Sequence, residues 1–528
     1  MPATESIWAA LGNKAFRRLW CASVALNLTI WMQSVAAAWL MVTMAASPLM
    51  VALIQTATAL PSFLFALPSG VMADLMDRRR YLMTVLAFMV LSSVVLCVLA
   101  WRGGLGPWSL LFLTFCLGAG FALQAPAWFT TQSDIVARSL LPSALALSTL
   151  SYSSARAVGP ALAGAMVSGF GVLAVFGLGA LLLAGALAVV IMWDSPRRAS
   201  QLPPESLAAG IGSALRYVRH SAMMQVQILR TVLFVGAASA LWALLPLLAG
   251  AGGSAAGAYG LLLGCMGAGA VTGALLLPRL KNHIDMNPMM GYAALMYAGT
   301  TLCGAYLRSL PLLCMALFLS GIAWLAVGNT NMLALQSAVP AWIRARAIAV
   351  YMLAFQGAMA AGSAFWGLVA SHAGAAMTLA ASAGAMCIVA LVMRRFPARI
   401  GELPEVTAAD GFLHGEVATL QAPDASPVAV QISYRVAPRD REAFLRLAYA
   451  MGKVRRRDGA SLWRVYRDLD DESCYVERFL VDSWSQYLRQ RGRATMADVA
   501  LEQEMWTLHA GSEPPRIAHF VAQAHPDG

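Results

Sequence analysis

The sequence predicts an all-α membrane protein with twelve transmembrane helices in two six-helix halves, followed by a C-terminal α+β domain with ferredoxin-like order. Three observations support this fold class. The chain of 528 residues is 59% hydrophobic and only 12% charged, whereas a soluble protein carries about 25% charged residues. Its apolar runs are long enough to cross a hydrocarbon core of about 30 Å. Charged residues become frequent only after residue 400, which indicates a separate soluble tail.

The apolar runs fall into two groups of six, separated by the longest loop. The predicted domains are residues 1–192 for the first half, 193–222 for a cytoplasmic loop, 223–399 for the second half, 400–427 for a linker and 428–528 for the soluble domain. The predicted spans are 22–44, 50–71, 81–101, 108–127, 144–170, 172–192, 223–249, 256–278, 288–306, 310–330, 347–370 and 375–393.

Basic residues are distributed unevenly between the loops on the two sides of the membrane. One set of loops carries nearly all the lysine and arginine, and the alternate set carries only Arg102 and Arg308. Because loops rich in lysine and arginine stay in the cytoplasm, we expect both termini there. In the central loop, residues 205–220 place apolar side chains near helical spacing, which favours an amphipathic helix over a plain hinge.

The two halves contain a weak internal repeat. The segment that begins at Gln132 resembles the segment that begins at Gln336, and with one residue of slippage Gly159 aligns with Gly362 and Gly164 with Gly367. Two related halves around a midplane site are typical of secondary transporters.

The loop after the second span reads GVMADLMDRRR, residues 70–80. An ordinary positive loop would explain its arginines but not the glycine and aspartate at this spacing. The stretch resembles the major facilitator superfamily signature of that loop, with Leu75 and Asp77 standing where the signature has arginine and glycine. The matching residues, which the resemblance implies for gating, are Gly70, Asp74, Arg78 and Arg79.

The fifth span contains a second motif. Gly159, Pro160 and Gly164 resemble the antiporter signature of the same superfamily, which accompanies export. Proline removes a backbone hydrogen bond and bends the helix, and small residues allow close helix packing. The alternative interpretation is that the motif only forms a kinked surface for helix packing and does not determine the direction of transport.

Stretches along the whole chain narrow the resemblance. They are NLTIWMQSVAAAWLM in the first span, SALWALLPLLA in the seventh and WIRARAIAVYMLAFQGAMAAGSAFWG leading into the eleventh. Together with the soluble tail, they resemble the enterobactin-exporter-like branch of the superfamily, the transmembrane secretion effectors. The resemblance implies an exporter in the inner membrane of a bacterium.

Arg156 lies within the predicted fifth span, beside the polar strip STLSYSS at residues 148–154. A cation in hydrocarbon is costly and usually faces a wet cavity. No acidic residue lies at comparable depth, so either Arg156 and Arg230 bond backbone carbonyls or water, or they attract an anionic solute. Trp242 and other tryptophans suit aromatic stacking or an interfacial belt. The candidate cavity residues are Arg156, Arg230, Asn27, Trp31, Gln33, Tyr152 and Gln356.

Few residues are suited to energy coupling or chemistry. Asp74 and Asp134 are the acids of the first half near moving helix ends, and are therefore the candidates for proton coupling. No phosphate-binding loop is present, so ATP is not expected to drive the protein directly. The eight cysteines show no metal-ligand spacing, and we expect no metal and no cofactor.

The tail predicts the order β-α-β-β-α-β, which is ferredoxin-like. It resembles the antibiotic-biosynthesis-monooxygenase type of domain. His509 and His519 lie on different predicted elements, and neither has a matched nucleophile. We therefore expect no catalytic residues and a docking or homodimer module rather than an enzyme.

These features predict a proton-coupled exporter of a small, partly anionic metabolite such as a siderophore. A broad-specificity multidrug exporter is the alternative within transport, and a membrane-tethered monooxygenase is the alternative of another class. The expected partners are a small-molecule substrate, protons and the lipid bilayer, with a homodimer formed through the tail and no nucleic acid.

Overall fold

The computed structural model describes residues 8–44, 47–136, 140–193, 207–251, 256–280, 285–340, 343–395, 426–492 and 494–523. Contacts divide the chain into two units. The first contains Met1–Pro203, Ile228–Asn331 and Tyr351–Pro397. The second contains Pro204–Gln227, Met332–Val350 and Ala398–Gly528, so it groups part of the predicted central loop with the tail. The predicted domain boundaries stay predictions.

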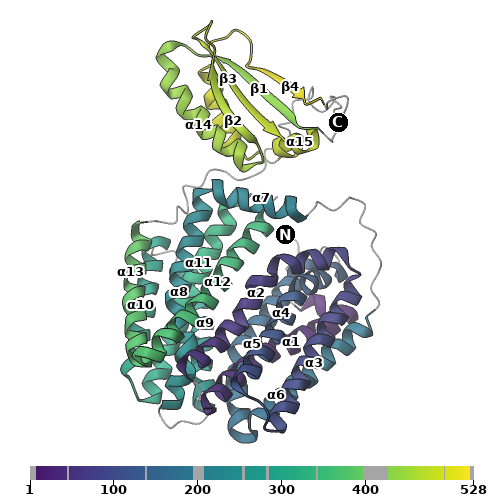
Figure 1. The fold of residues 1–528 in the computed structure, drawn as a ribbon, viewed down its shortest axis with the longest axis vertical. Coiled ribbons are helices and arrows are strands. Elements are labelled where there is room, and N and C mark those ends of the chain that lie inside the picture. The colour runs from purple at the N-terminus through teal and green to yellow at the C-terminus, as the bar shows by residue number, and fades with distance from the viewer. Residues whose placement is uncertain are drawn as a thin grey trace. The chain divides into compact units, whose positions relative to one another are not determined.

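Long helices build most of the first unit, and one end each of α8, α11 and α12 belongs to the second unit. Figure 1 shows α1–α6 and α8–α13 as two groups. The first group comprises α1 Lys14–Thr43, α2 Pro48–Leu75, α3 Arg78–Trp101, α4 Pro107–Ile135, α5 Leu141–Phe170 and α6 Val172–Ile191. The second comprises α8 Ala222–Ala251, α9 Ala256–Leu280, α10 Met286–Tyr306, α11 Leu310–Ala338, α12 Arg344–Ala373 and α13 Ala375–Arg395.

Ten of these helices, within the described ranges, are long and apolar enough to cross a membrane. The helices α5 and α10 are not among the ten. In α5 the mean hydropathy is lowered by its run of serines and by Arg156, the same polar features that make this helix a candidate for lining a site. The predicted number of twelve spans, and their relation as two halves, stay predictions.

Side-chain caps and prolines set several helix starts. The side chain of Asn13 accepts hydrogen bonds from the backbone N–H groups of Ala15 and Phe16 at the start of α1. Asp77 accepts from the N–H of Arg80 at the start of α3. Such caps satisfy N–H groups that have no partner within the helix. Pro48 stands in the first turn of α2, where its missing N–H costs nothing.

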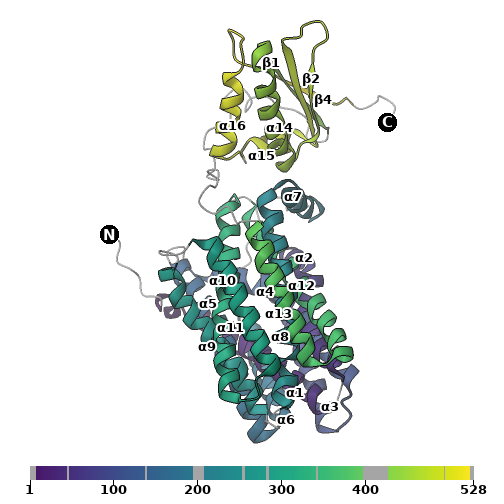
Figure 2. The same cartoon turned by 90° about the vertical axis from the view of Figure 1, so that its left-hand side faces the viewer.

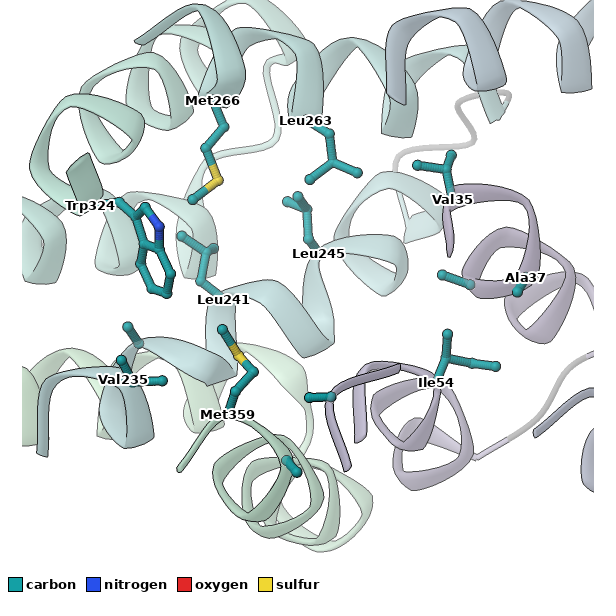
Figure 3. Close-up of a cluster of buried hydrophobic side chains, with 14 of the residues drawn as sticks. Val35, Ala37, Ile54, Val235, Leu241, Leu245, Leu263, Met266, Trp324 and Met359 are labelled. Atoms are coloured by element: carbon teal, nitrogen blue, oxygen red, sulfur yellow. The ribbon is translucent and has the colours of Figure 1, made fainter. Parts of the chain in front are cut away.

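A buried apolar core joins helices from both groups. Figure 3 shows Val35 of α1 and Ile54 of α2 in the same cluster as Leu241 of α8, Leu263 of α9 and Met359 of α12. All five side chains are at most 8% exposed. In a bilayer, where lipid tails are as apolar as leucine, this close packing holds helices together through van der Waals contact.

The second unit contains the C-terminal domain. Its elements are β1 Val428–Arg435, α14 Arg441–Arg457, β2 Ser461–Arg467, β3 Cys474–Val481, α15 Trp484–Gly492, α16 Met496–Thr507 and β4 Arg516–Val521. The sheet order is β2-β3-β1-β4, and every neighbouring pair is antiparallel. The predicted four strands are therefore present in the predicted order, and two helices, α15 and α16, stand between β3 and β4 where the order β-α-β-β-α-β has one.

One face of this sheet carries the domain core. Val428, Val430, Ile432 and Tyr434 alternate along β1 and are buried with Phe444 of α14. Figure 2 shows α14 and α16 together on one side of the strands. The period-two pattern of the sequence thus puts the apolar side chains against the helices.

The predicted helix of the loop between the two groups is present as α7, Leu207–His220. It has a strongly amphipathic pattern, and Tyr217 is 3% exposed whereas Leu215 is 56% exposed. Within the second unit, α7 packs against α14. A helix rather than an open hinge therefore precedes α8.

Candidate functional site

The side chain of Arg156 lies between two tryptophans that come from different groups of helices. Its guanidinium carbon is 5.6 Å from the ring centroid of Trp31 in α1 and 5.8 Å from that of Trp242 in α8. Each cation–π contact contributes about 0.5–2 kcal/mol, depending on how well water is excluded. Among the residues that the structure describes, no carboxylate pairs with Arg156.

A small cavity adjoins this arginine. The space that a water-sized molecule can occupy is about 10 Å³ beside Arg156 and about 40 Å³ in the neighbouring cavity, which Trp31 and Trp242 also line. The site is therefore almost filled by its own side chains in this conformation. The lining of the first cavity includes Trp31, Arg156, Pro160, Trp242, Met266 and Trp324.

The cavity is rich in unpaired hydrogen-bond donors. The indole N–H groups of Trp31 and Trp242 are buried and have no acceptor among the described residues. The guanidinium beside them also only donates. A buried donor without a partner costs roughly 1–3 kcal/mol, so the local chemistry favours a ligand that supplies acceptors.

Two other predicted cavity residues lie on α1 and α5, the helices that carry Trp31 and Arg156, although neither lines either cavity. The ring of Tyr152 packs edge-on against Trp31, with centroids 6.3 Å apart. The side-chain amide of Asn27 donates to the Ser151 hydroxyl at 3.0 Å and so joins α1 to α5. Tyr152 is 48% exposed, which leaves its ring accessible.

The remaining predicted cavity residues lie elsewhere. The amide of Gln33 donates to the hydroxyl of Ser93 in α3 at 2.8 Å, away from the arginine. Gln356 is half-buried on α12 and does not line either cavity.

Arg230 also lies apart from Arg156. Its side chain is packed between α8 and α10, 1% exposed, with Asn287 as its acceptor at 3.3 Å and the sulfur of Met290 at 2.9 Å. The second group of helices therefore presents Trp242, rather than Arg230, to Arg156.

The glycine–proline motif of α5 forms the contact with two other helices. A Cβ atom on Gly159 would lie 2.9 Å from the Cβ of Trp31, and one on Gly164 would lie 2.7 Å from the Cα of Gly260 in α9. The backbone N–H of Gly257 also donates to the Ser168 hydroxyl at 2.7 Å. Small residues are therefore needed here because α5 and α9 approach backbone to backbone.

The aligned glycines of α12 make equivalent contacts. A Cβ on Gly362 would lie 2.8 Å from the carbonyl oxygen of Gly236 in α8, and one on Gly367 would lie 3.3 Å from the Cα of Leu49 in α2. In α5, Gly159 contacts α1, the first helix of its own group, and Gly164 contacts α9, the second helix of the other group. In α12, Gly362 likewise contacts α8, the first helix of its own group, and Gly367 contacts α2, the second helix of the other group. The sequence repeat corresponds to a repeat of helix contacts.

The structure describes the predicted gating loop only in part. Gly70 and Asp74 lie in α2, and the side chains of Asp74 and Asp134 are outside the described set. Asp77 caps α3, and Arg78 begins that helix. The guanidinium of Arg79 donates to the carbonyl of Ile191 and so joins the start of α3 to the end of α6.

Sequence reasoning did not select Trp324, which belongs to this site. Its ring lies 5.5 Å from that of Trp242 and 6.0 Å from that of Phe355, centroid to centroid. One signal was available: Trp31, Trp242 and Trp324 all stand several residues inside their apolar runs, whereas interfacial tryptophans stand near the ends.

Ionised groups of the C-terminal domain pair with one another. Arg455 contacts Glu502 at 2.6 Å and Glu477 at 3.5 Å, and Arg491 contacts Glu502 at 3.3 Å. Burial opposes the charge of Glu502, but the two arginines hold the pKa of its carboxyl below the usual range. Both ring nitrogens of His509 bond backbone groups. These pairings have the character of a structural core rather than of a poised acid or base.

Comparison with known proteins decides the family. A family model described as transmembrane secretion effector matches residues 5–527. The chain belongs to this family. The secretion effector is thus a major facilitator superfamily transporter that passes through the membrane several times, and not an enzyme.

Solved structures with the same fold cover the membrane part of this secretion effector. A mutant of the nucleoside transporter NupG is 12% identical, with a TM-score of 0.62 over 72% of this chain and 99% of that chain. A bacterial homologue of the human lysosomal transporter Spinster is 14% identical, with a TM-score of 0.58 over 72% and 95%. A bacterial homologue of the iron transporter ferroportin is 14% identical, with a TM-score of 0.55 over 73% and 99%. No curated protein matches the secretion effector.

Proposed function

We propose that this transporter exports a small solute that carries negative charge, and that the solute binds at Arg156 between Trp31 and Trp242. The observation that carries the proposal is the excess of donors around the cavity. A guanidinium and two buried indole N–H groups meet no acceptor among the described residues. An anionic solute with several oxygen acceptors is complementary to this set, as a siderophore is.

Transport in this proposal is alternating access around that site. Residues 16–192 rock against residues 223–393, as in other transporters built from repeats. Arg156 contacts one tryptophan from each group, so relative motion of the groups opens or closes the site. Because the cavity beside Arg156 is so small, the two indoles have to separate before a solute enters.

The orientation follows from the distribution of basic residues. Two hydrogen bonds join the two groups of helices near one end of the bundle. The backbone N–H of Gly257 in α9 donates to the Ser168 hydroxyl of α5, and the Thr56 hydroxyl of α2 donates to the carbonyl of Ala360 in α12 at 2.9 Å. In the proposed orientation, with both termini in the cytoplasm of a bacterium, this closed end faces the periplasm. The structure then corresponds to a state that awaits solute from the cytoplasm.

Proton antiport is the proposed energy source, with Asp74 and Asp134 as candidate proton carriers. A carboxylate near a moving helix end can be neutralised in one state and exposed in the other. The motif Gly159-Pro160 with Gly164 supports export through its resemblance to the antiporter signature, and its close contact with Trp31 links it directly to the site.

The decisive experiment is a deletion strain whose secreted small molecules are measured with and without iron. We expect the loss of one anionic metabolite from the medium, restored by the wild-type gene but not by Arg156→Gln at equal membrane abundance. An unchanged set of secreted compounds under both conditions would overturn the proposed export.

A multidrug exporter of low selectivity is the second candidate, because tryptophans dominate the cavity and stack many planar molecules. It predicts efflux of several unrelated cationic dyes that survives Arg156→Gln. The anion-selective proposal predicts that such dyes are not transported by the wild type.

The C-terminal domain is proposed to form a homodimer rather than to catalyse a reaction. Gel filtration of the detergent-purified protein, with and without residues 400–528, tests this role. Loss of the dimer on truncation supports it, whereas an unchanged mass argues that the membrane part alone sets the oligomeric state.

A further inference from the structure

Two cysteines lie next to each other where α9 and α11 pack together. Cys265 belongs to α9 and Cys314 to α11, and both are free, partly buried thiols. Their side chains are close enough to interact with each other. Such proximity is what a disulfide requires, because the two Cα atoms have to lie within about 7 Å.

The backbones of the two helices account for this proximity. A Cβ atom on Gly269 of α9 would lie 3.0 Å from the Cα of Phe318 in α11, and one on Gly273 would lie 3.2 Å from the Cα of Ile322. Between these two contacts both helices advance by one turn of four residues. The helices therefore run in the same direction and stay in register along their contact.

The same step of one turn, taken towards the start of both helices, leads from the first of these contacts to Cys265 and Cys314. The contact is equally close when it is measured from the other helix, since a Cβ on Gly321 of α11 would lie 2.9 Å from the backbone nitrogen of Ala270. Glycine contacts of this kind allow helix backbones to approach closely. Two facing helix surfaces, rather than loops, thus hold the thiols together.

The pair lies towards the end of α11 that is proposed to face the periplasm. Cys314 stands one turn after Leu310, where α11 begins, and the loop before it contains Arg308, which is predicted to be periplasmic. The bacterial periplasm is an oxidising compartment in which disulfides form and persist. The compartment, unlike the contact between the thiols, follows from the proposed orientation.

We propose that Cys265 and Cys314 form a disulfide that joins α9 to α11, with a protein disulfide of the periplasm as the oxidant. The Cys314 sulfur loses its proton and attacks the oxidant, whose released sulfur takes up a proton. The Cys265 sulfur then loses its proton and displaces the oxidant, whose second sulfur takes up that proton. Two thiols of the transporter are oxidised to one disulfide, and one disulfide of the oxidant is reduced to two thiols.

The disulfide has a mechanical consequence for α9, which lies between two helices. Gly260 of α9 contacts Gly164 of α5 in the first group, whereas Gly269 contacts Phe318 of α11 in the second. A covalent bond to α11 keeps α9 with the second group when its contact with α5 is broken. Because a cross-link also restricts the unfolded chain, we expect oxidation to raise the melting temperature.

Counting thiols in the purified full-length protein tests the proposal without any solute. One variant keeps Cys265 and Cys314 and carries alanine at the other six cysteines. It is treated with diamide, an azo compound whose N=N bond accepts the two hydrogen atoms, and is then denatured and labelled with a maleimide–polyethylene glycol reagent. We expect two labels per chain before diamide and none after it, on a monomer band, with a higher melting temperature that dithiothreitol reverses.

A matched variant keeps Cys21 and Cys314 instead. Cys21 is an exposed thiol on α1, in the other group of helices, and we expect both labels to remain after diamide. Mass spectrometry of the wild type follows the same oxidation through the disulfide-linked peptides of α9 and α11, so the test does not depend on the alanine substitutions. Labelling of intact cells with a membrane-permeant maleimide before lysis reports the natural state.

The possible results separate clearly. Two labels after diamide in the variant with Cys265 and Cys314, together with no linked peptide from the wild type, mean that the sulfur atoms do not reach bonding geometry. Equal loss of labels in the variant with Cys21 means that disulfides form by collision and not by proximity. Free thiols in intact cells refute oxidation by the periplasm. A failed solute assay changes none of these results, so this proposal and the proposed export fail independently.

Discussion

Gly164 of α5 and Gly260 of α9 approach so closely that a Cβ atom on either residue would lie within 2.7 Å of the Cα of the other. The two helices belong to different groups, and this is where their backbones meet. A contact of this kind needs glycine on both sides, because any side chain would push the helices apart.

We expect Gly164→Ala to impair transport and to lower the melting temperature. The added methyl group overlaps backbone atoms of α9 that cannot rotate away, and overpacking of this kind costs about 1–3 kcal/mol. Gly169→Ala is the matched control on the same helix, since its Cβ would meet no atom within 4 Å. Equal transport and equal melting temperature in the two variants would show that the helices tolerate separation at this point.

Variants of Arg156 can separate its proposed role in solute binding from its contribution to stability. Arg156→Gln is expected to reduce export of the anionic solute about tenfold or more, since hydrogen bonds to charged groups contribute about 1.5–3 kcal/mol. Arg156→Lys keeps the charge but loses the planar fork, and should retain partial export. Vesicle transport and melting temperature are measured on the same purified variants. Lowered stability with unchanged export would assign the arginine to packing alone.

Topology gives a prediction that is independent of the solute. The loop at Arg79 and the C-terminal tail are expected on the cytoplasmic side, and Arg102 and Arg308 on the periplasmic side. Single cysteines introduced at these positions are labelled in whole cells with a reagent that does not cross the membrane. Labelling of the tail without cell lysis contradicts the orientation and, with it, the assignment of the closed end.

The C-terminal domain is expected to lose stability in mild acid through His519. Burial lowers the pKa of this imidazole, and the charge of Arg491 lowers it further. The unfolded chain, with a pKa of about 6.5, then binds the proton more readily, so the contribution of His519 to stability is complete above that pH. It is lost as the pH falls through the lower folded-state pKa.

His519→Phe tests this pH dependence because it keeps an aromatic ring between Trp484 and Tyr487 but removes the titration. The urea midpoint of the domain is followed by hydrogen exchange of its peptides in the full-length protein. The wild type should lose more stability than the variant between pH 7.5 and pH 5.5. Parallel pH profiles would exclude His519 as the responsible group.

The sequence predicted the elements of this protein better than their contacts. Apolar runs, basic loops and period-two strands identified the helices and the sheet because burial imposes those patterns locally. The polar strip beside Arg156 likewise indicated that one side of this helix faces away from lipid. No local pattern tells which distant helix packs on that strip, so the contacts of Trp242 with Arg156 and with Trp324 emerged only from the fold.

Some predicted cavity residues lie away from Arg156, again because a local pattern does not tell which helix a side chain will meet. Asn27 and Gln33 are both amides of α1, yet one bonds to α5 near Arg156 and the other to Ser93 of α3. Arg230 is, like Arg156, a rare cation within a predicted span, but it meets Asn287 of α10. Hydropathy marks such residues as unsuited to lipid, and it carries no information on which interior surface they share.

The two indoles on either side of Arg156 also provide a fluorescence signal from within the proposed site. The Arg156 guanidinium places a positive charge over the ring face of both Trp31 and Trp242. The two tryptophans lie on helices that move apart in the proposed cycle. Their emission should therefore change when the stack opens, without any attached dye. A variant that keeps only these two tryptophans would let turnover be watched in real time from the ultraviolet fluorescence of the unlabelled protein.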